Sequence, residues 1–134
     1  MRCDIKISLC SFQTSVPEQM GNGMGKLLLR LRRAYIESRI LWLEDRLIYR
    51  REIVADYDRA FKRYAELEAL GVDKLDSAQR EEFIKLGPAK SHQARDDYRT
   101  HRRIAADIKA TMAELKLELA EIIRQLELLA VTIG

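Results

Sequence analysis

The sequence predicts an all-α protein: a long antiparallel helical hairpin of the coiled-coil type, closed by a short connecting helix. From Ala94 to Ile133, twelve positions separated by alternating steps of four and three residues are apolar, with His101 as the one polar exception. This spacing is typical of a helix that buries a narrow stripe against another helix. The 134 residues are 47% hydrophobic and 34% charged with only two prolines, which is the composition of one domain built from long helices.

Residues 1–25 differ from the rest of the chain and are predicted to be a separate N-terminal segment. Apolar and polar residues alternate from Ile5 to Cys10, which favours a short strand, and the glycine-rich stretch 21–25 after Pro17 indicates a flexible link. A single strand has nothing to pair with inside a helical chain. The segment is therefore expected to be disordered, to dock on the helices, or to pair with a second copy.

Residues 26–134 are predicted to form the helical hairpin domain. Its first helix is expected to run from Lys26 to Leu70 and to end where Gly71 adopts a left-handed conformation. Asp76 or Ser77 should then cap a short second helix.

The connector carries strong signals for helix ends. Gln79 follows Asp76 by three residues, the spacing of a capping box, so the short helix should extend from there to Leu86. Gly87 and Pro88 then match the usual glycine at a helix end and proline at a helix start. The third helix should run from Pro88 to Ile133.

The first helix has a matching but less regular apolar seam. Its members are Ile36, Ile40, Leu43, Leu47, Arg50, Val54, Tyr57, Phe61 and Tyr64. Folding the chain at its connector places Leu43 near Leu115 and Ile36 near Ile122. It also places the aromatic residues of the first helix near Ala94, Tyr98 and His101.

Charge patterning supports the same antiparallel pairing. Residues 26–51 hold eight basic and three acidic groups, whereas their expected partner, 107–127, holds three basic and five acidic groups. Residues 52–68 are net −2 and face residues 90–103, which are net +3. Opposite blocks disfavour a parallel arrangement, although each exposed pair adds little stability.

Apolar residues outside the two seams predict homo-oligomerisation, most simply two hairpins forming a four-helix bundle. A two-helix hairpin buries one stripe per helix, so additional apolar residues need another partner. The alternative is that the N-terminal segment folds back and covers them. The residues expected at the oligomer interface are Leu28, Leu31, Tyr35, Trp42, Leu43, Tyr49, Leu119, Ile123, Leu126 and Leu128.

Two basic segments are candidates for binding anions or nucleic acid. One opens the first helix, where the helix dipole disfavours cations, and the other lies near the connector beside aromatic residues. In both cases a solvated helix face is the alternative interpretation. The residues are Arg30, Arg32, Arg33, Arg95, Arg99, Arg102 and Arg103.

The polar seam residues Arg50 and His101 are interpreted as register or specificity positions rather than catalytic ones. His101 is expected to pair with Tyr57 or Asp58, and Arg50 to pack its stem while its head reaches water. No metal, cofactor or catalytic site is predicted. The two histidines are nine residues apart and no glycine-rich phosphate loop follows a strand.

The order of a long, a short and a long helix resembles the all-helical chorismate mutases. Arg33 and Arg50, 17 residues apart, are similar to the arginine spacing of that family. The aspartates and the downstream lysine of the family pattern do not align, and the third helix is too long. The resemblance would imply an enzyme that acts on chorismate.

The favoured interpretation is a non-enzymatic coiled-coil scaffold, adaptor or regulator that acts through homo-oligomerisation, with the connector end free for a protein partner. Nucleic-acid association through the basic helix faces is the alternative function. Both cysteines, Cys3 and Cys10, lie in the N-terminal segment, which fits a reducing, cytoplasmic location. No apolar run reaches the roughly 20 residues needed to span a bilayer.

Overall fold

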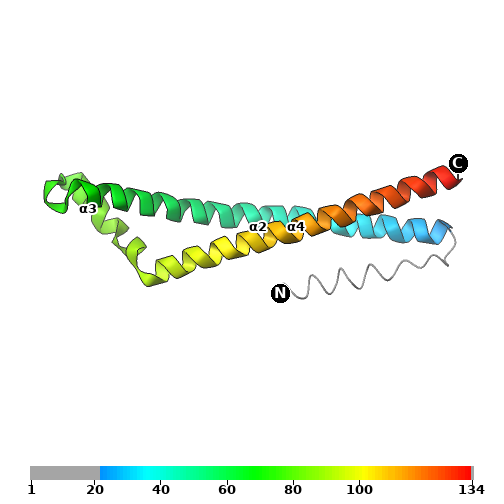
Figure 1. Ribbon diagram of the computed structural model, residues 1–134, viewed down its shortest axis with the longest axis horizontal. Helices are drawn as coiled ribbons and strands as arrows, with labels where there is room; N and C mark the ends of the chain where they lie inside the picture. The colour runs from blue at the N-terminus through cyan, green and yellow to red at the C-terminus, as the bar shows by residue number, and fades with distance from the viewer. Residues whose placement is uncertain (1–21, 134) are drawn as a thin grey trace. The chain divides into compact units, whose positions relative to one another are not determined.

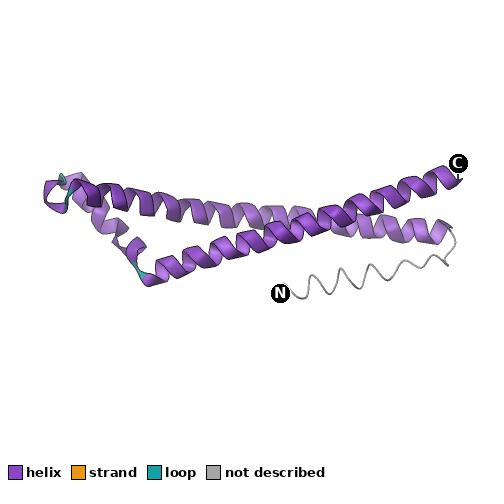
Figure 2. Ribbon diagram, in the orientation of Figure 1, coloured by secondary structure: helices purple, strands orange, loops and turns teal. Residues whose placement is uncertain are grey.

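Helices form almost all of the part of the chain that the structure describes. The computed structural model describes residues 22–133, with side chains from 23 to 131, and this range contains no strand (Figure 2). The prediction of an all-α protein is confirmed. The elements are α2 (Asn22–Leu70), η1 (Val72–Lys74), α3 (Ser77–Leu86), η2 (Gly87–Lys90) and α4 (His92–Ile133).

The described residues divide into two compact units. Unit 1 contains residues 22–45 of α2 and 107–133 of α4, and unit 2 contains residues 46–106. Within each unit a segment of α2 lies beside a segment of α4 (Figure 1). A continuous hairpin and a four-helix bundle remain predictions.

The core of unit 1 contains predicted seam residues of both helices together with Leu29, which lies on the same stripe of α2. Its buried apolar side chains are between 0% and 7% exposed, because heptad spacing brings them onto one stripe of each helix. The predicted seam residues Ile108, Leu119, Leu126 and Leu129 are half-buried. The buried apolar residues of unit 1 are Leu29, Ile36, Ile40, Leu43, Met112, Leu115 and Ile122. Thr111 is also buried, and its hydroxyl donates to the backbone oxygen of Asp107 at 3.0 Å, which satisfies the polar group.

Two contacts show that the segments of α2 and α4 run antiparallel within unit 2. Arg50 contacts His101 and Asp58 contacts Tyr98, so residue numbers rise along α2 as they fall along α4. Glu68, near the end of α2, pairs with Lys90 of η2. Beside the turn at the end of α2, Leu67 and Leu75 are buried.

The connector has the predicted helix caps. The Gln79 backbone N–H donates to the Asp76 carboxylate at 2.8 Å, and the Asp76 N–H donates to the Gln79 side-chain oxygen at 3.0 Å. This reciprocal pair is a capping box and fixes the start of α3. Gly71 has a φ of +91°, so the residue that ends α2 lies in the region that favours glycine.

The predicted start of the third helix at Pro88 is wrong. Gly87 has a right-handed conformation, and the chain continues through the 3-10 turn η2 before α4 begins at His92. Ser91 is extended, and its hydroxyl accepts a hydrogen bond from the Ala94 N–H at 3.1 Å. Serine caps a helix effectively in this extended conformation, and the fixed φ of Pro88 suits the preceding tight turn.

The first helix begins at Asn22, four residues before the predicted start, so residues 22–25 are helical rather than a flexible link. Each further residue adds to an existing helix at small cost, and the strong helix formers that follow outweigh the two glycines. The predicted strand and both cysteines lie outside the described residues.

Candidate functional site

Five exposed apolar residues of unit 1 lie on a second face of α2. Steps of three, four, four and seven residues separate them, and this face differs from the one that holds Ile36, Ile40 and Leu43. Their exposed fractions range from 44% to 60%. We call this set the outer stripe: Met24, Leu27, Leu31, Tyr35 and Trp42.

A cation–π contact adds to the outer stripe at its C-terminal end. The guanidinium carbon of Arg39 lies 4.5 Å from the centroid of the Trp42 ring. Such a contact holds the arginine head over the ring face and is worth about 0.5–1 kcal/mol at an exposed site. Tryptophan, tyrosine and arginine are also the residues that contribute most to protein interfaces.

The other predicted interface residues are distributed unevenly. Leu43 is only 2% exposed and belongs to the core of unit 1, so its assignment to an outer surface requires correction. Leu28, Leu119, Ile123 and Leu126 are half-buried. Leu128 and, in unit 2, Tyr49 are exposed.

Only part of the predicted basic patch at the start of the first helix is accessible. Arg33 is half exposed and pairs with Glu37 at 3.1 Å, and Arg30 is exposed. Arg32 is 7% exposed and forms an ion pair with Glu118, whose side chain is 9% exposed. Arg32 is thus a core residue of unit 1 and not an anion ligand at its surface.

The Arg32–Glu118 ion pair was missed, although the sequence contains its signal. Arg32 follows Leu29 by three residues and precedes Ile36 by four, which places it on the buried stripe of α2. Glu118 has the same relation to Leu115 and Ile122 on α4. Burial lowers the pKa of Arg32, because a charged group loses hydration there.

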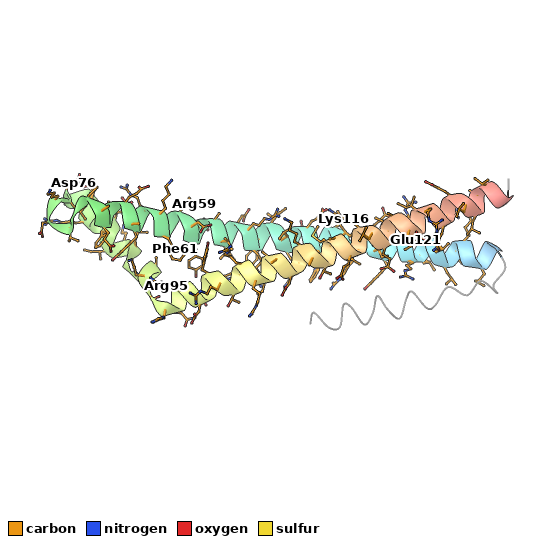
Figure 3. All side chains as sticks on the ribbon, viewed as in Figure 1. Arg59, Phe61, Asp76, Arg95, Lys116 and Glu121 are labelled. Carbon is orange, nitrogen blue, oxygen red and sulfur yellow. The ribbon has the colours of Figure 1, made fainter. Side chains whose placement is uncertain are left out.

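An aromatic cluster joins the two long helices inside unit 2. The Phe61 and Tyr98 rings meet edge to face with centroids 5.1 Å apart, and Tyr57 lies 6.1 Å from Tyr98 and 6.4 Å from His101. Phe61 points from α2 toward α4 (Figure 3). The predicted proximity of these aromatic residues is confirmed. Edge-to-face pairs contribute about 0.5–1.5 kcal/mol beyond the burial of their area.

Polar tips close this cluster toward solvent. The Tyr98 hydroxyl donates to Asp58 at 2.6 Å, and this hydrogen bond is the main reason why the pKa of Tyr98 is raised. Asp58 is therefore engaged with Tyr98 and not with His101, which corrects one predicted pairing. The guanidinium of Arg102 lies 5.5 Å from the Tyr98 ring centroid.

Arg50 and His101 bond directly to each other. Arg50 Nη1 lies 2.7 Å from His101 Nδ1. A guanidinium has no acceptor, so in this hydrogen bond Arg50 donates and His101 Nδ1 accepts. The two polar seam residues thus satisfy each other, whereas Arg50 was expected to reach water.

The connector is held by a second group of contacts. Tyr64 stacks on Phe83 with ring centroids 4.6 Å apart. Arg63 binds both carboxylate oxygens of Glu82, one of them at 3.2 Å. This bidentate pair lowers the pKa of Glu82 and raises that of Arg63.

Arginines near the start of α4 are exposed. Arg95 lies in the first turns of the helix (Figure 3), and Arg99, Arg102 and Arg103 follow on the same side. Because a helix has 3.6 residues per turn, spacings of four, three and one residues bring the four side chains onto one side of α4. The second predicted basic segment is thus present as an exposed cluster.

Replacing Arg124 by glutamine is expected to raise the pKa of Glu121 from about 2 toward its usual value near 4.5. The hydrogen bond from Arg124 lowers this pKa most, and Gln125 contributes less. Because the folded pKa is depressed, the contribution to stability is present above about pH 4.5 and is lost as the pH falls toward 2. Carboxyl ¹³C NMR titration measures the shift.

The matched control for that titration is Gln125→Ala, which removes the weaker hydrogen bond at 3.2 Å. It should raise the Glu121 pKa by less than Arg124→Gln does. Equal shifts from the two substitutions would contradict the ranking of the causes. The side chains of Glu121 and Arg124 are exposed, so we expect little change in the free energy of unfolding when their ion pair is removed.

Three further observations bear on function. No group of three or more potential metal ligands occurs among the described residues, and no described helix is long and apolar enough to cross a membrane. Arg33, one of the two arginines behind the resemblance to chorismate mutases, pairs with Glu37, and Arg50 binds His101.

Comparison of the chain with protein-family models, with curated protein sequences and with solved structures finds no significant match in any of the three.

Proposed function

We propose that the protein is a non-enzymatic coiled-coil scaffold that assembles through unit 1 into a homodimer. The observation that carries the proposal is the outer stripe, a row of large apolar side chains at least 44% exposed. Burying such a side chain completely is worth about 1.5–3 kcal/mol. A contiguous row of them is more typical of an interface than of a solvated helix face.

A second copy of the chain is the occupant that the charges favour. Four of the five outer-stripe residues lie in the basic block 26–51, and unit 1 also contains the acidic block 107–127. The acidic block on α4 of a second copy is therefore a helix of opposite charge for the basic block on α2. Leu117 and Val131, which are 76% and 78% exposed on α4, supply apolar surface for the same contact.

A two-fold arrangement closes this assembly. If α2 of each copy packs on α4 of the other, each outer stripe is buried against the other copy. The result is a four-helix bundle. Heterologous packing would instead continue into a filament. The connector residues of unit 2 would remain available for another protein partner.

Light scattering over a concentration series tests the proposal. We expect the wild-type chain to have twice the mass of the 15.6 kDa protomer at micromolar concentration. The double variant Leu27→Glu, Leu31→Glu places two charges on the outer stripe and should weaken the dimer at least 100-fold. Both leucines are more than half exposed, so the helix content measured by circular dichroism should not change.

The matched control is Ile84→Glu, since Ile84 is 74% exposed on α3 in unit 2. It introduces a charge at an exposed apolar position outside the outer stripe and should leave the mass unchanged. A wild-type monomer at all concentrations would contradict the proposal. A monomer that dimerises only after removal of residues 1–21 would assign the outer stripe to the N-terminal segment instead.

A further inference from the structure

We infer that unit 2 carries a binding site for the phosphate backbone of nucleic acid on the exposed side of α4. The site is a row of four exposed arginines, which we call the arginine ladder: Arg95, Arg99, Arg102 and Arg103. This surface consists of unit 2 residues alone, so it shares no residue with the proposed dimer interface in unit 1.

The arginine ladder has like charges at positions four residues apart, where opposite charges would stabilise a helix. Arg95, Arg99 and Arg103 follow one another at intervals of four residues, and each such like-charged pair costs about 0.2–0.5 kcal/mol. Elsewhere on the chain the same spacing is used for ion pairs, as between Arg33 and Glu37. A row of repelling cations indicates a surface that is stabilised by an external anion.

These three arginines form no ion pair with any described side chain, and three acids of unit 2 bind other groups. Asp58 accepts the hydroxyl of Tyr98 at 2.6 Å, and Asp97 accepts the side-chain amide of Gln93 at 2.9 Å. Asp56 pairs with Arg59. The guanidinium groups of Arg95, Arg99 and Arg103 therefore keep their hydrogen-bond donors for a ligand.

The spacing fits a polymer with repeated charges rather than a single ion. Four residues of α-helix rise about 6 Å, so the ladder presents cations at regular steps over about 12 Å. Nucleic acid carries a phosphate at every nucleotide, and arginine binds phosphate oxygens through two parallel hydrogen bonds. Contacts of this kind position the protein on the backbone without reading the base sequence.

The composition of the same face disfavours a membrane surface. A helix that binds a lipid bilayer needs large apolar side chains along with its cations. The other residues on this side of α4 are His92, Asp96 and Ala106, none of which inserts into a bilayer. Nucleic acid is the polyanion that these residues fit.

The test measures binding of a fluorescent 30-base-pair DNA duplex of random sequence, and of the RNA duplex of the same sequence, by anisotropy. With about four phosphate contacts, the logarithm of the affinity should fall with log salt at a slope near −3.6, so the affinity should fall about 150-fold between 50 and 200 mM. The triple variant Arg95→Gln, Arg99→Gln, Arg103→Gln should reduce the slope to about −1. Arg102 is kept because it contacts Tyr98.

The matched control removes the same charge from exposed positions of unit 2 outside the ladder: Lys62→Gln, Lys74→Gln, Arg80→Gln. It should leave the slope near −3.6. Asp96→Asn gives a test of opposite sign, because removing this acid from beside Arg99 should tighten binding. Circular dichroism confirms that each variant remains helical.

Three outcomes would overturn the inference. Equal loss of binding in the triple variant and in the control would show attraction to net charge alone. Binding to vesicles containing 30% phosphatidylserine but to neither duplex would assign the ladder to a membrane. Absence of binding to both duplexes at 50 mM salt would exclude the site. Preference for one duplex would identify its source as DNA or RNA, and either supports the inference.

Discussion

Replacing Glu118 by alanine is expected to destabilise unit 1 by about 3–5 kcal/mol. Its carboxylate is the ion-pair partner of Arg32, and both side chains are less than 10% exposed. Removing one member of a buried pair leaves the other as an uncompensated charge in a medium of low dielectric constant. Urea unfolding followed by circular dichroism measures the loss of free energy of unfolding. The variant Arg32→Ala, which removes the other member of the pair, should show a loss of the same order.

The double variant Arg32→Met, Glu118→Leu should regain most of this loss. Replacing a buried ion pair by apolar residues of similar volume is often neutral or stabilises a protein by about 1–4 kcal/mol, because neither charge needs to be desolvated. Together with the two single variants it completes a double-mutant cycle. We expect a coupling energy of at least about 2 kcal/mol between the two positions.

An exposed ion pair on the same helix provides the comparison. Glu37 pairs with Arg33, next to Arg32, but the two side chains are 49% and 44% exposed. Glu37→Ala should therefore change stability by no more than about 0.5 kcal/mol. A similar loss for Glu37→Ala and Glu118→Ala would contradict the assignment of Arg32 and Glu118 to the core.

The sequence was sufficient to predict the helices and the buried stripes. Heptad spacing depends on backbone geometry alone, so positions such as Ile36, Leu115 and Ile122 could be assigned to the core without knowledge of their partners. The capping box at Asp76 and Gln79 was equally readable, because its contacts span three residues.

Contacts between distant residues were harder to predict. His101 could form a hydrogen bond with several neighbours on the first helix, as donor or acceptor, and the pattern offered no means of choosing Arg50 over Tyr57 or Asp58. Neighbouring residues of α2 point about 100° apart, so a shift by one residue changes which polar group faces the His101 ring. Helical periodicity fixes a face to within a few tens of degrees, which is not enough to select a hydrogen-bond partner.

Composition misled the interpretation of Arg32. Its neighbours Arg30 and Arg33 suggested one basic patch, although the three residues point in different directions around a helix with 100° per residue. The number of charges in a sequence segment does not show which of them are exposed, whereas burial depends on the face of the helix on which a residue lies. The arginine ladder illustrates the opposite case, since its spacing brings the charges onto one side of α4.

In unit 2, Leu67→Ala is expected to cost about 2–5 kcal/mol of folding free energy. Leu67 is 0% exposed and lies one turn before Gly71, where α2 ends. Truncation removes its apolar contacts and leaves a cavity that the surrounding helices fill only in part. Urea unfolding gives the loss, and hydrogen exchange should show that amides of the connector lose protection first.

Leu70→Ala is the matched control, because Leu70 is 50% exposed and lies on the same helix three residues later. Both variants change leucine to alanine in the last turn of α2, so any effect on helix propensity is shared. The difference between them therefore isolates burial, and we expect it to exceed about 2 kcal/mol. Equal losses would contradict the assignment of Leu67 to a buried position that packing stabilises, because alanine has the higher helix propensity and cannot cause the loss. A loss confined to Leu67 would mean that the position of the connector depends on this buried side chain.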